Sequence, residues 1–258
     1  MSRLVDYEVS GPVARITLNS PHNRNALSAV LVQQLHQGLR DAAADPAVRA
    51  VVLGHTGGTF CAGADLSEAS SGDALAGAVA RARELTALLR AIVESPLPVV
   101  AAIDGHVRAG GLGLVGACDI VVAGTKSTFA LTEARLGVAA AIISLTLLPK
   151  MTARSAGRYF LTGEKFGAEE AAAIGLVTVA TDDVAGAVAA ITAEIGRGSP
   201  QGLAASKALT TVAILEDFDR RAELLADQSA RLFMSEEARE GMLAFLQKRP
   251  PRWAEPAP

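Results

Sequence analysis

The stretch VVAAIDGHVRAGGLG, residues 99–113, determines the architecture that we expect for this chain. Its first five residues, Val99–Ile103, are apolar and predict a short buried strand. The small residues of 109–113 follow, and they predict a tight turn that opens a helix. The same order recurs where the apolar run 50–53 leads into HTGGTFCAGAD at 55–65. Two strand–turn–helix units of this kind indicate an α/β fold.

The rest of the chain continues this alternation and then becomes helical. Residues 13–18 alternate apolar and polar side chains, which predicts a half-buried strand, and Ser28 is the expected N-cap of the next helix. Further helices are predicted from about 76 to 95, up to Cys118, and through most of the chain after Ser144. Short strands are expected at 120–123, 128–131 and 177–179. The expected fold is a βα-alternating core with a C-terminal helical section.

The composition excludes several classes of protein. Half of the 258 residues are apolar and 20% are charged, so the chain can bury a core. Its 24 basic and 27 acidic residues give a net charge of −3, which argues against nucleic acid as a partner. The longest uncharged apolar stretch, 136–149, is shorter than the ~18 residues that span a membrane, so no membrane segment is expected. Two cysteines are too few for a disulfide framework and indicate a reduced, cytoplasmic protein.

Both glycine-rich loops are candidates for binding negative charge. The first N–H groups of a helix lack intrahelical partners, and small residues allow a ligand to approach the backbone closely. If the two turns converge, their N–H groups form an oxyanion hole that stabilises an enolate-like oxygen. The alternative interpretation is that each glycine serves only a tight turn.

Glu133 is the best candidate for acid–base chemistry. It lies between an apolar strand and an apolar run, where burial would raise its pKa toward a useful range. The alternative is a salt bridge to Arg135 or an exposed helix cap. Asp119 is expected to be a buried carboxylate that accepts backbone N–H groups. The four histidines are scattered without ligand spacing, so no metal site is predicted.

Gly111, Gly113 and Gly116 fit the dinucleotide-binding pattern G-x-G-x-x-G, with Glu133 about 20 residues further on. That pattern should directly follow a strand, whereas residues 104–109 separate these glycines from the predicted strand. A nicotinamide- or flavin-dependent enzyme therefore stays an alternative on this pattern alone.

Short segments around these residues, taken in order, resemble those of the enoyl-CoA hydratase/isomerase (crotonase) family. The tail EGMLAFLQKR at 240–249 resembles the family's C-terminal signature, so the similarity covers nearly the whole chain. The other matching segments are Asn25–Leu27, Phe60–Leu66, Pro98–Gly105, Gly110–Gly111, Cys118–Asp119 and Thr132–Gly137.

The resemblance implies an α/β spiral of repeated ββα units followed by a helical trimerisation section. On this basis residues 1–195 form the core with the acyl-CoA site, and residues 196–258 form the C-terminal helical section of the same functional unit. The implied substrate is an acyl-CoA thioester of fatty acid metabolism, with no cofactor beyond the CoA of the substrate. The implied assembly is a homotrimer or a dimer of trimers.

The resemblance also assigns residues to roles. The N–H groups of Ala64 and Gly110 form the implied oxyanion hole, and Glu133 is the implied proton-transfer group. The CoA contacts implied by the matching positions are Arg24, Ala26, Ala62, Asp65, Leu66 and Lys248.

The sequence also departs from the family pattern. Hydratases of the family typically hold a water between two glutamates, and the first of these falls on Gly113, a vacant catalytic position. The stretch 140–145, AAIISL, also replaces a glycine-rich segment and makes this side drier. The run from Thr132 to Ser144 nevertheless looks most like bacterial methylglutaconyl-CoA-type hydratases, so we expect hydration of a 2-enoyl-CoA. The alternatives are a single-glutamate isomerase and a non-catalytic acyl-CoA-binding protein.

A carboxylate on the substrate itself is one way to compensate for the vacant position. Arg108 and Arg135 flank the two site segments, and either could bind such a carboxylate. The sequence therefore predicts that a carboxylated, branched enoyl-CoA is a better substrate than crotonyl-CoA.

Overall fold

A computed structural model describes residues 3–65, 68 and 74–254, and its strands form two sheets. In the larger sheet β1 and β2 are antiparallel and the other neighbours are parallel. Its order is β1 (Val5–Ser10), β2 (Val13–Leu18), β3 (Ala50–His55), β5 (Val99–Ile103), β7 (Ile120–Gly124) and β10 (Val179–Thr181). The smaller sheet has the order β4 (Thr59–Cys61), β6 (His106–Arg108), β8 (Thr128–Ala130) and β9 (Phe166–Gly167).

The chain steps repeatedly from the larger sheet to the smaller one. β3 passes into β4, β5 into β6 and β7 into β8, and helices α2 (Ala74–Glu94) and α3 (Gly110–Ala117) follow the first two pairs. Between β5 and β6 the backbone bends at Gly105, where an added Cβ would lie 2.8 Å from the carbonyl oxygen of Gly58. The expected α/β fold of ββα units is thereby confirmed.

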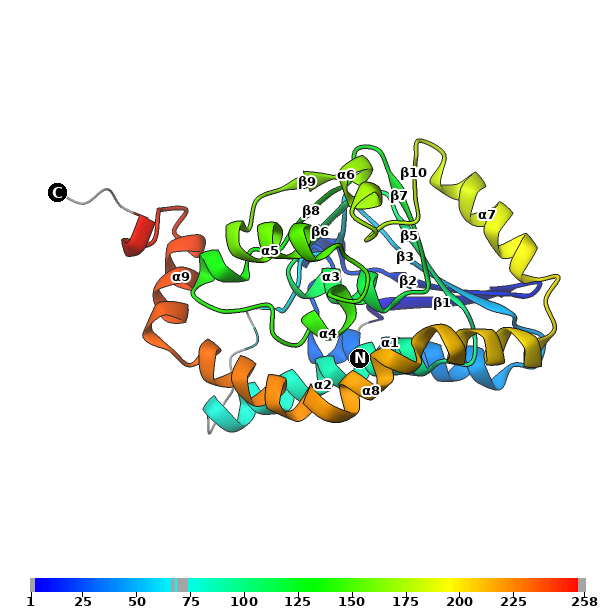
Figure 1. The fold of residues 1–258 in the computed structure, drawn as a ribbon, viewed down its shortest axis with the longest axis horizontal. Coiled ribbons are helices and arrows are strands. Elements are labelled where there is room, and N and C mark those ends of the chain that lie inside the picture. The colour runs from blue at the N-terminus through cyan, green and yellow to red at the C-terminus, as the bar shows by residue number, and fades with distance from the viewer. Residues whose placement is uncertain (1–2, 66–67, 69–73, 255–258) are drawn as a thin grey trace.

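Helices cover the sheets and extend beyond them (Figure 1). The longest, α8 (Pro200–Phe233), lies against α2, and α9 (Glu236–Leu246) follows it toward the C-terminal end. The other helices are α1 (Ala29–Ala44), α4 (Ser144–Leu147), α5 (Ala153–Thr162), α6 (Ala168–Ala173) and α7 (Val184–Ile195), with 3-10 turns η1 (Pro21–Asn23), η2 (Glu133–Leu136) and η3 (Arg252–Ala254). The C-terminal section is helical, as expected, whereas the boundary at residue 195 stays a prediction.

An ion pair between the buried Lys207 and the half-buried Asp119 joins α8 to the core. The Lys207 ammonium lies 2.8 Å from the Asp119 carboxylate and donates to the carbonyl oxygens of Ile92 (2.9 Å) and Leu97 (3.0 Å). Asp119 also accepts the N–H of Val99 at 2.7 Å, which confirms that it binds a backbone donor, although it is half-buried rather than buried and its pairing with Lys207 was not expected. Because all three ammonium protons have partners, the desolvation of Lys207 is compensated.

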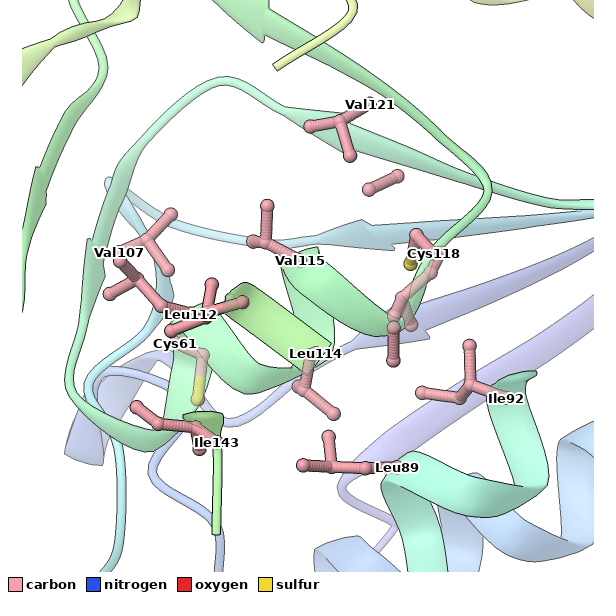
Figure 2. Close-up of a cluster of buried hydrophobic side chains, with 14 of the residues drawn as sticks. Cys61, Leu89, Ile92, Val107, Leu112, Leu114, Val115, Cys118, Val121 and Ile143 are labelled. Carbon is pink, nitrogen blue, oxygen red and sulfur yellow. The ribbon is translucent and has the colours of Figure 1, made fainter. Parts of the chain in front are cut away.

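Helix α3 lies inside an apolar cluster (Figure 2). Its glycines allow very close packing, because an added Cβ would lie 2.8 Å from Cys61 Cβ at Gly111 and 2.8 Å from the Thr146 carbonyl oxygen at Gly116. Strand β6 ends at Arg108, so a strand does precede these glycines, contrary to expectation. The pattern is nevertheless explained by packing within the protein rather than by a nucleotide.

Some element boundaries differ from expectation. The strand expected at 177–179 is β10 at Val179–Thr181, and β4 and β6 lie in segments for which no strand was predicted. Both are three residues long, too short for a clear alternation of side chains. In the part of the chain that the structure describes, none of the helices is both long and apolar enough to cross a membrane.

Candidate active site

Three neighbouring parallel strands of the smaller sheet end at one edge. The registers pair Cys61 of β4 with Val107 of β6, and Val107 with Phe129 of β8. Ala64, Gly110 and Glu133 each follow one of these strands by two or three residues. The carboxyl ends of parallel strands are the usual place for a ligand. The fold therefore brings three sequence-predicted residues to the same edge.

The first loop presents the N–H of Ala64. Gly63 has a φ of +92°, a conformation that favours glycine, and its carbonyl oxygen accepts the Leu27 N–H at 2.8 Å. Ala64 continues this contact as an isolated parallel bridge to Leu27. These contacts hold the backbone on either side of Ala64, which is itself an exposed residue.

The second loop presents the N–H of Gly110 beside that of Ala64. Gly110 begins α3, where the backbone N–H has no partner within the helix. A Cβ added to Gly63 would lie 3.2 Å from Gly110 N, and one added to Gly110 would lie 3.7 Å from Ala64 N. The two N–H groups that the resemblance pairs therefore lie close together, as an oxyanion hole requires.

The residue before Gly110 is strained. Ala109 has φ 46° and ψ −124°, which costs a non-glycine residue about 1–3 kcal/mol. Its N–H donates to the Ala130 carbonyl oxygen at 3.1 Å, which ties the turn to β8. Strain of this kind is common where a backbone group must face a ligand.

Glu133 begins η2 and its carboxyl group is buried, with the residue 9% exposed. Its Oε2 has no hydrogen-bond partner among the described residues. Desolvation raises its pKa to about 7, against a small lowering by its own backbone N–H. The alternative of a salt bridge to Arg135 is wrong, because the Arg135 Nε donates to the Thr162 carbonyl oxygen. The alternative of an exposed helix cap is also wrong, because Glu133 is buried. A carboxyl group with a pKa near neutrality can both accept and return a proton.

Two apolar side chains occupy the space next to the vacant position. A Cβ added to Gly113 would lie 2.5 Å from Ile143 Cγ2 and 3.2 Å from Leu89 Cδ1. Ile143 belongs to the stretch 140–145, in which every residue is buried. The expectation of a drier side is therefore consistent with the packing around Gly113.

Most of the candidate CoA-binding positions lie beside the first loop. Arg24 is exposed, and its carbonyl oxygen accepts the Ala62 N–H at 3.1 Å. Asp65 accepts the Asn23 amide at 3.0 Å, and Ala26 is buried next to this turn. Leu66 lies outside the described residues. Lys248 is exposed after α9, and among the described residues no hydrogen bond or ion pair joins it to this turn.

Asn25 is a further residue at the site. In the sequence it was identified only as part of a matching segment, without a role of its own. It is fully buried, and its amide oxygen accepts the Ser20 N–H at 2.7 Å. Its amide nitrogen donates to the carbonyl oxygens of Thr56 (3.0 Å) and Thr59 (2.8 Å). Asn25 therefore holds the turn before α1 against the loop that leads to Ala64. A signal was available, because asparagine tolerates the left-handed φ of 53° found here.

The two arginines considered for a substrate carboxylate differ. Arg108 is half-buried, and its guanidinium donates to the Val107 and Thr128 carbonyl oxygens and to Thr128 Oγ1. Burial lowers its pKa. Arg135 is exposed and lines an open cavity of about 410 Å³ with Leu161 and Trp253. Arg135 is therefore the more accessible of the two cations.

The chemistry available at this edge is acid–base chemistry next to backbone donors. Both cysteines are buried with pKa values raised to about 12 by desolvation, so neither is a reactive thiolate. Across residues 3–65, 68 and 74–254, no group of three or more His, Cys, Asp or Glu side chains could hold a metal ion.

Known proteins are similar to this chain in sequence and in fold. The family model for enoyl-CoA hydratase/isomerase matches residues 8–256. The 2,3-dehydroadipyl-CoA hydratase of Escherichia coli is 33% identical over 93% of this chain and 94% of its own. The mevalonyl-coenzyme A hydratase of Aspergillus fumigatus is 32% identical over 92% of this chain and 90% of its own. The crystal structure of an enoyl-CoA hydratase from Mycobacterium avium is 69% identical, with a TM-score of 0.93 over 98% of this chain and 100% of that chain.

These matches extend over almost the entire chain, and the TM-score of 0.93 shows that the solved structure has the same fold. The relatives named above are acyl-CoA hydratases, which supports an enzyme of hydratase/isomerase type. The chain belongs to the enoyl-CoA hydratase/isomerase (crotonase) family.

Proposed function

We propose that this enzyme adds water to a 2-enoyl-CoA and that Glu133 is its proton-transfer group. The observation that carries the proposal is the buried Glu133 carboxyl, whose Oε2 has no partner among the described residues and whose pKa is about 7. It lies at the same sheet edge as the N–H groups of Ala64 and Gly110. The relatives named as hydratases favour hydration over the other reactions of the family.

In the proposed reaction the thioester oxygen accepts hydrogen bonds from Ala64 and Gly110. The Glu133 carboxylate removes a proton from water while the water oxygen forms a bond to C3 of the enoyl group. The C2–C3 π electrons move toward the thioester, which becomes an enolate held by the two N–H groups. Glu133 then returns the proton to C2, so the product is a 3-hydroxyacyl-CoA and the carboxylate is restored.

Double-bond isomerisation is the second candidate. It is favoured by Ile143 and Leu89, which occupy the space around Gly113 and leave that side apolar. An isomerase needs one carboxylate to move a proton between two carbons and needs no water. The non-catalytic alternative is disfavoured because the family relatives are enzymes and Glu133 is retained.

We also propose that the preferred substrate carries a carboxylate. One relative is named for 2,3-dehydroadipyl-CoA, the CoA ester of a dicarboxylic acid. The exposed Arg135 at the cavity beside η2 is the candidate partner for that carboxylate, because a charge-assisted pair contributes about 1.5–3 kcal/mol.

Turnover in oxygen-18 water distinguishes these proposals. Crotonyl-CoA is compared with a branched, carboxylated 2-enoyl-CoA, and the products are analysed by mass spectrometry. A labelled 3-hydroxyacyl product supports hydration, whereas a shifted double bond without label establishes isomerisation. Equal rates for both substrates would reject the carboxylate preference. The matched variant Arg135→Gln should lower the rate only for the carboxylated substrate.

The backbone donors are tested by Gly110→Pro. Proline lacks the N–H but fits the first position of a helix, which is where Gly110 lies. Losing one such donor typically costs about 3 kcal/mol in the transition state, so turnover should fall at least about 100-fold. A folded variant with normal turnover would exclude Gly110 as a donor.

We further propose a cytoplasmic homotrimer or dimer of trimers. Helix α8 leaves Leu209 79% exposed and Leu224 67% exposed, and large apolar side chains of this kind are frequent at subunit contacts. Light scattering of the purified protein measures the mass of the assembly, and a monomer would contradict the proposed trimer.

The CoA moiety is proposed to contact Arg24, Ala26, Ala62, Asp65, Leu66 and Lys248.

A further inference from the structure

The turn that carries Glu133 is packed backbone to backbone against a helix about a hundred residues later in the sequence. At Gly137, which ends η2 with φ +75°, an added Cβ would lie 2.5 Å from the carbonyl carbon of Glu237. At Gly241, in the middle of α9, an added Cβ would lie 2.5 Å from the carbonyl carbon of Leu136. Each element therefore places a glycine against the main chain of the other, and no side chain separates them at these points.

A second set of contacts brings the chain after α9 back toward η2. Glu240 is only 7% exposed, and its two oxygens accept the Arg249 guanidinium at 2.6 and 2.9 Å. It also accepts the Arg252 N–H at 3.0 Å. Residues 251, 253 and 254 line the open cavity of about 410 Å³ together with Ala134 and Arg135 of η2. The C-terminal segment thus contacts η2 through α9 and also faces it across this cavity.

The position of the Glu133 carboxyl depends on this packing. Within the described residues Oε2 has no hydrogen bond to a neighbouring side chain that would hold it. Glu133 is also the first of only four residues in η2, so a displacement of the turn moves the carboxyl directly. A misplacement of about 1 Å at a reacting group can cost about 100-fold in rate.

We propose that Gly241 is a positioning residue for proton transfer by Glu133, because its lack of a side chain lets α9 hold η2 at the correct distance. This inference rests on the proposed function, in which Glu133 transfers the proton. Gly241→Ala would force the Leu136 main chain and α9 apart, because a carbon 2.5 Å away is far inside van der Waals contact. The reacting atoms would then be displaced while the loops at Ala64 and Gly110 stay unchanged.

The test compares Gly241→Ala with Gly157→Ala in the full-length protein. Gly157 is also a helical glycine, but a Cβ added there would meet no described atom within 4 Å beyond its own helical backbone and its chain neighbours. Calorimetric titration with butyryl-CoA, which has no double bond, measures the number of binding-competent sites. We expect Gly241→Ala to keep its binding sites and a KM within about threefold, while kcat per site falls at least about 10-fold. Gly157→Ala should keep normal values.

A kcat per site within twofold of the wild type in Gly241→Ala would overturn the proposal. If Gly241→Ala shows no binding sites, Ala238→Gly decides instead, because it adds no atom and loosens α9 where its backbone faces Gly137. A threefold or larger fall in its kcat per site supports the positioning role, and an unchanged kcat rejects it. Glu133→Gln is measured in parallel. If it keeps full turnover, both proposals fail, whereas an inactive Glu133→Gln beside a normal Gly241→Ala rejects the positioning role alone.

Discussion

Two short segments, 20–28 and 132–138, each bury a polar side chain, and the two side chains differ in their hydrogen-bond partners. Asn25 is fully buried and makes three hydrogen bonds with the backbone. Glu133 is almost as buried, but its Oε2 has no partner within the described residues. Buried polar groups are normally satisfied, so the first turn follows the general rule and the second is an exception.

The difference indicates what each side chain is for. A satisfied amide stabilises one backbone arrangement, because removing it would leave several buried groups unpaired. An unsatisfied carboxyl group destabilises the fold, and desolvation raises its pKa to about 7. Groups perturbed in this way gather at functional sites. We therefore expect Asn25 to govern stability and Glu133 to govern turnover, and three experiments test this contrast.

The largest expected effect is on turnover in Glu133→Gln. Glutamine keeps the shape of the side chain but cannot transfer a proton, so kcat should fall by roughly 10²–10⁴-fold. Steady-state kinetics with the best enoyl-CoA substrate measure the loss, and butyryl-CoA binding serves as the control for an intact site. Normal turnover would show that the unpaired carboxyl has no part in the reaction.

The next effect is on stability in Asn25→Ala. The variant removes the three hydrogen bonds that Asn25 makes with the Ser20 N–H and the Thr56 and Thr59 carbonyl oxygens, and it places alanine at a left-handed φ of 53°. We expect the free energy of unfolding to fall by about 3 kcal/mol. Urea denaturation measures the loss.

Asn23→Ala is the matched control for that variant, because Asn23 is only half-buried and its amide donates to the Asp65 side chain. It should lose about 1 kcal/mol or less. Equal losses in the two variants would remove the contrast between the buried and the half-buried amide.

The smallest effect is a pH-dependent gain in stability in Glu133→Gln. The pKa of Glu133 is raised on folding from 4.5 to about 7, so proton binding by Glu133 adds to the free energy of unfolding. This contribution is complete below pH 4.5 and is lost as the pH rises through 7. Above pH 7 the charged form costs up to about 3 kcal/mol, of which a buried glutamine amide would recover about 1–2 kcal/mol.

Thermal unfolding at several pH values tests this sign. The melting temperature of Glu133→Gln should exceed that of the wild type at pH 8.5, and the difference should disappear near pH 5. A variant that is less stable than the wild type at pH 8.5 would mean that the carboxylate gains compensating interactions in the folded state.

Much of the fold could be predicted from local patterns. The strands at 13–18 and 99–103 and the N-cap Ser28 follow from side-chain alternation, apolar runs and helix-capping chemistry, all of which act between near neighbours. β4 and β6 could not be predicted in this way, because three-residue strands are specified by their partners in the smaller sheet rather than by their own sequence.

The candidate site was likewise predictable from the sequence only in part. Its residues were identified from the ordered segments around 60–66, 110–111 and 132–137, which the chain carries in its sequence. Whether Glu133 pairs with Arg135 or stays unpaired could not be read there, because burial is decided by the elements that pack around η2. The same holds for Gly113, whose neighbours Ile143 and Leu89 come from two distant segments.

The sequence by itself determined the βα alternation, the two glycine turns and the presence of a carboxyl group beside them. Each of these depends on backbone preferences and on periodicity along a few residues. Only the tertiary structure decided that Ala64, Gly110 and Glu133 share one edge and that α9 rests on the turn of Glu133. Those relations join residues up to about a hundred positions apart, and they follow from the close packing of whole elements, which local sequence does not encode.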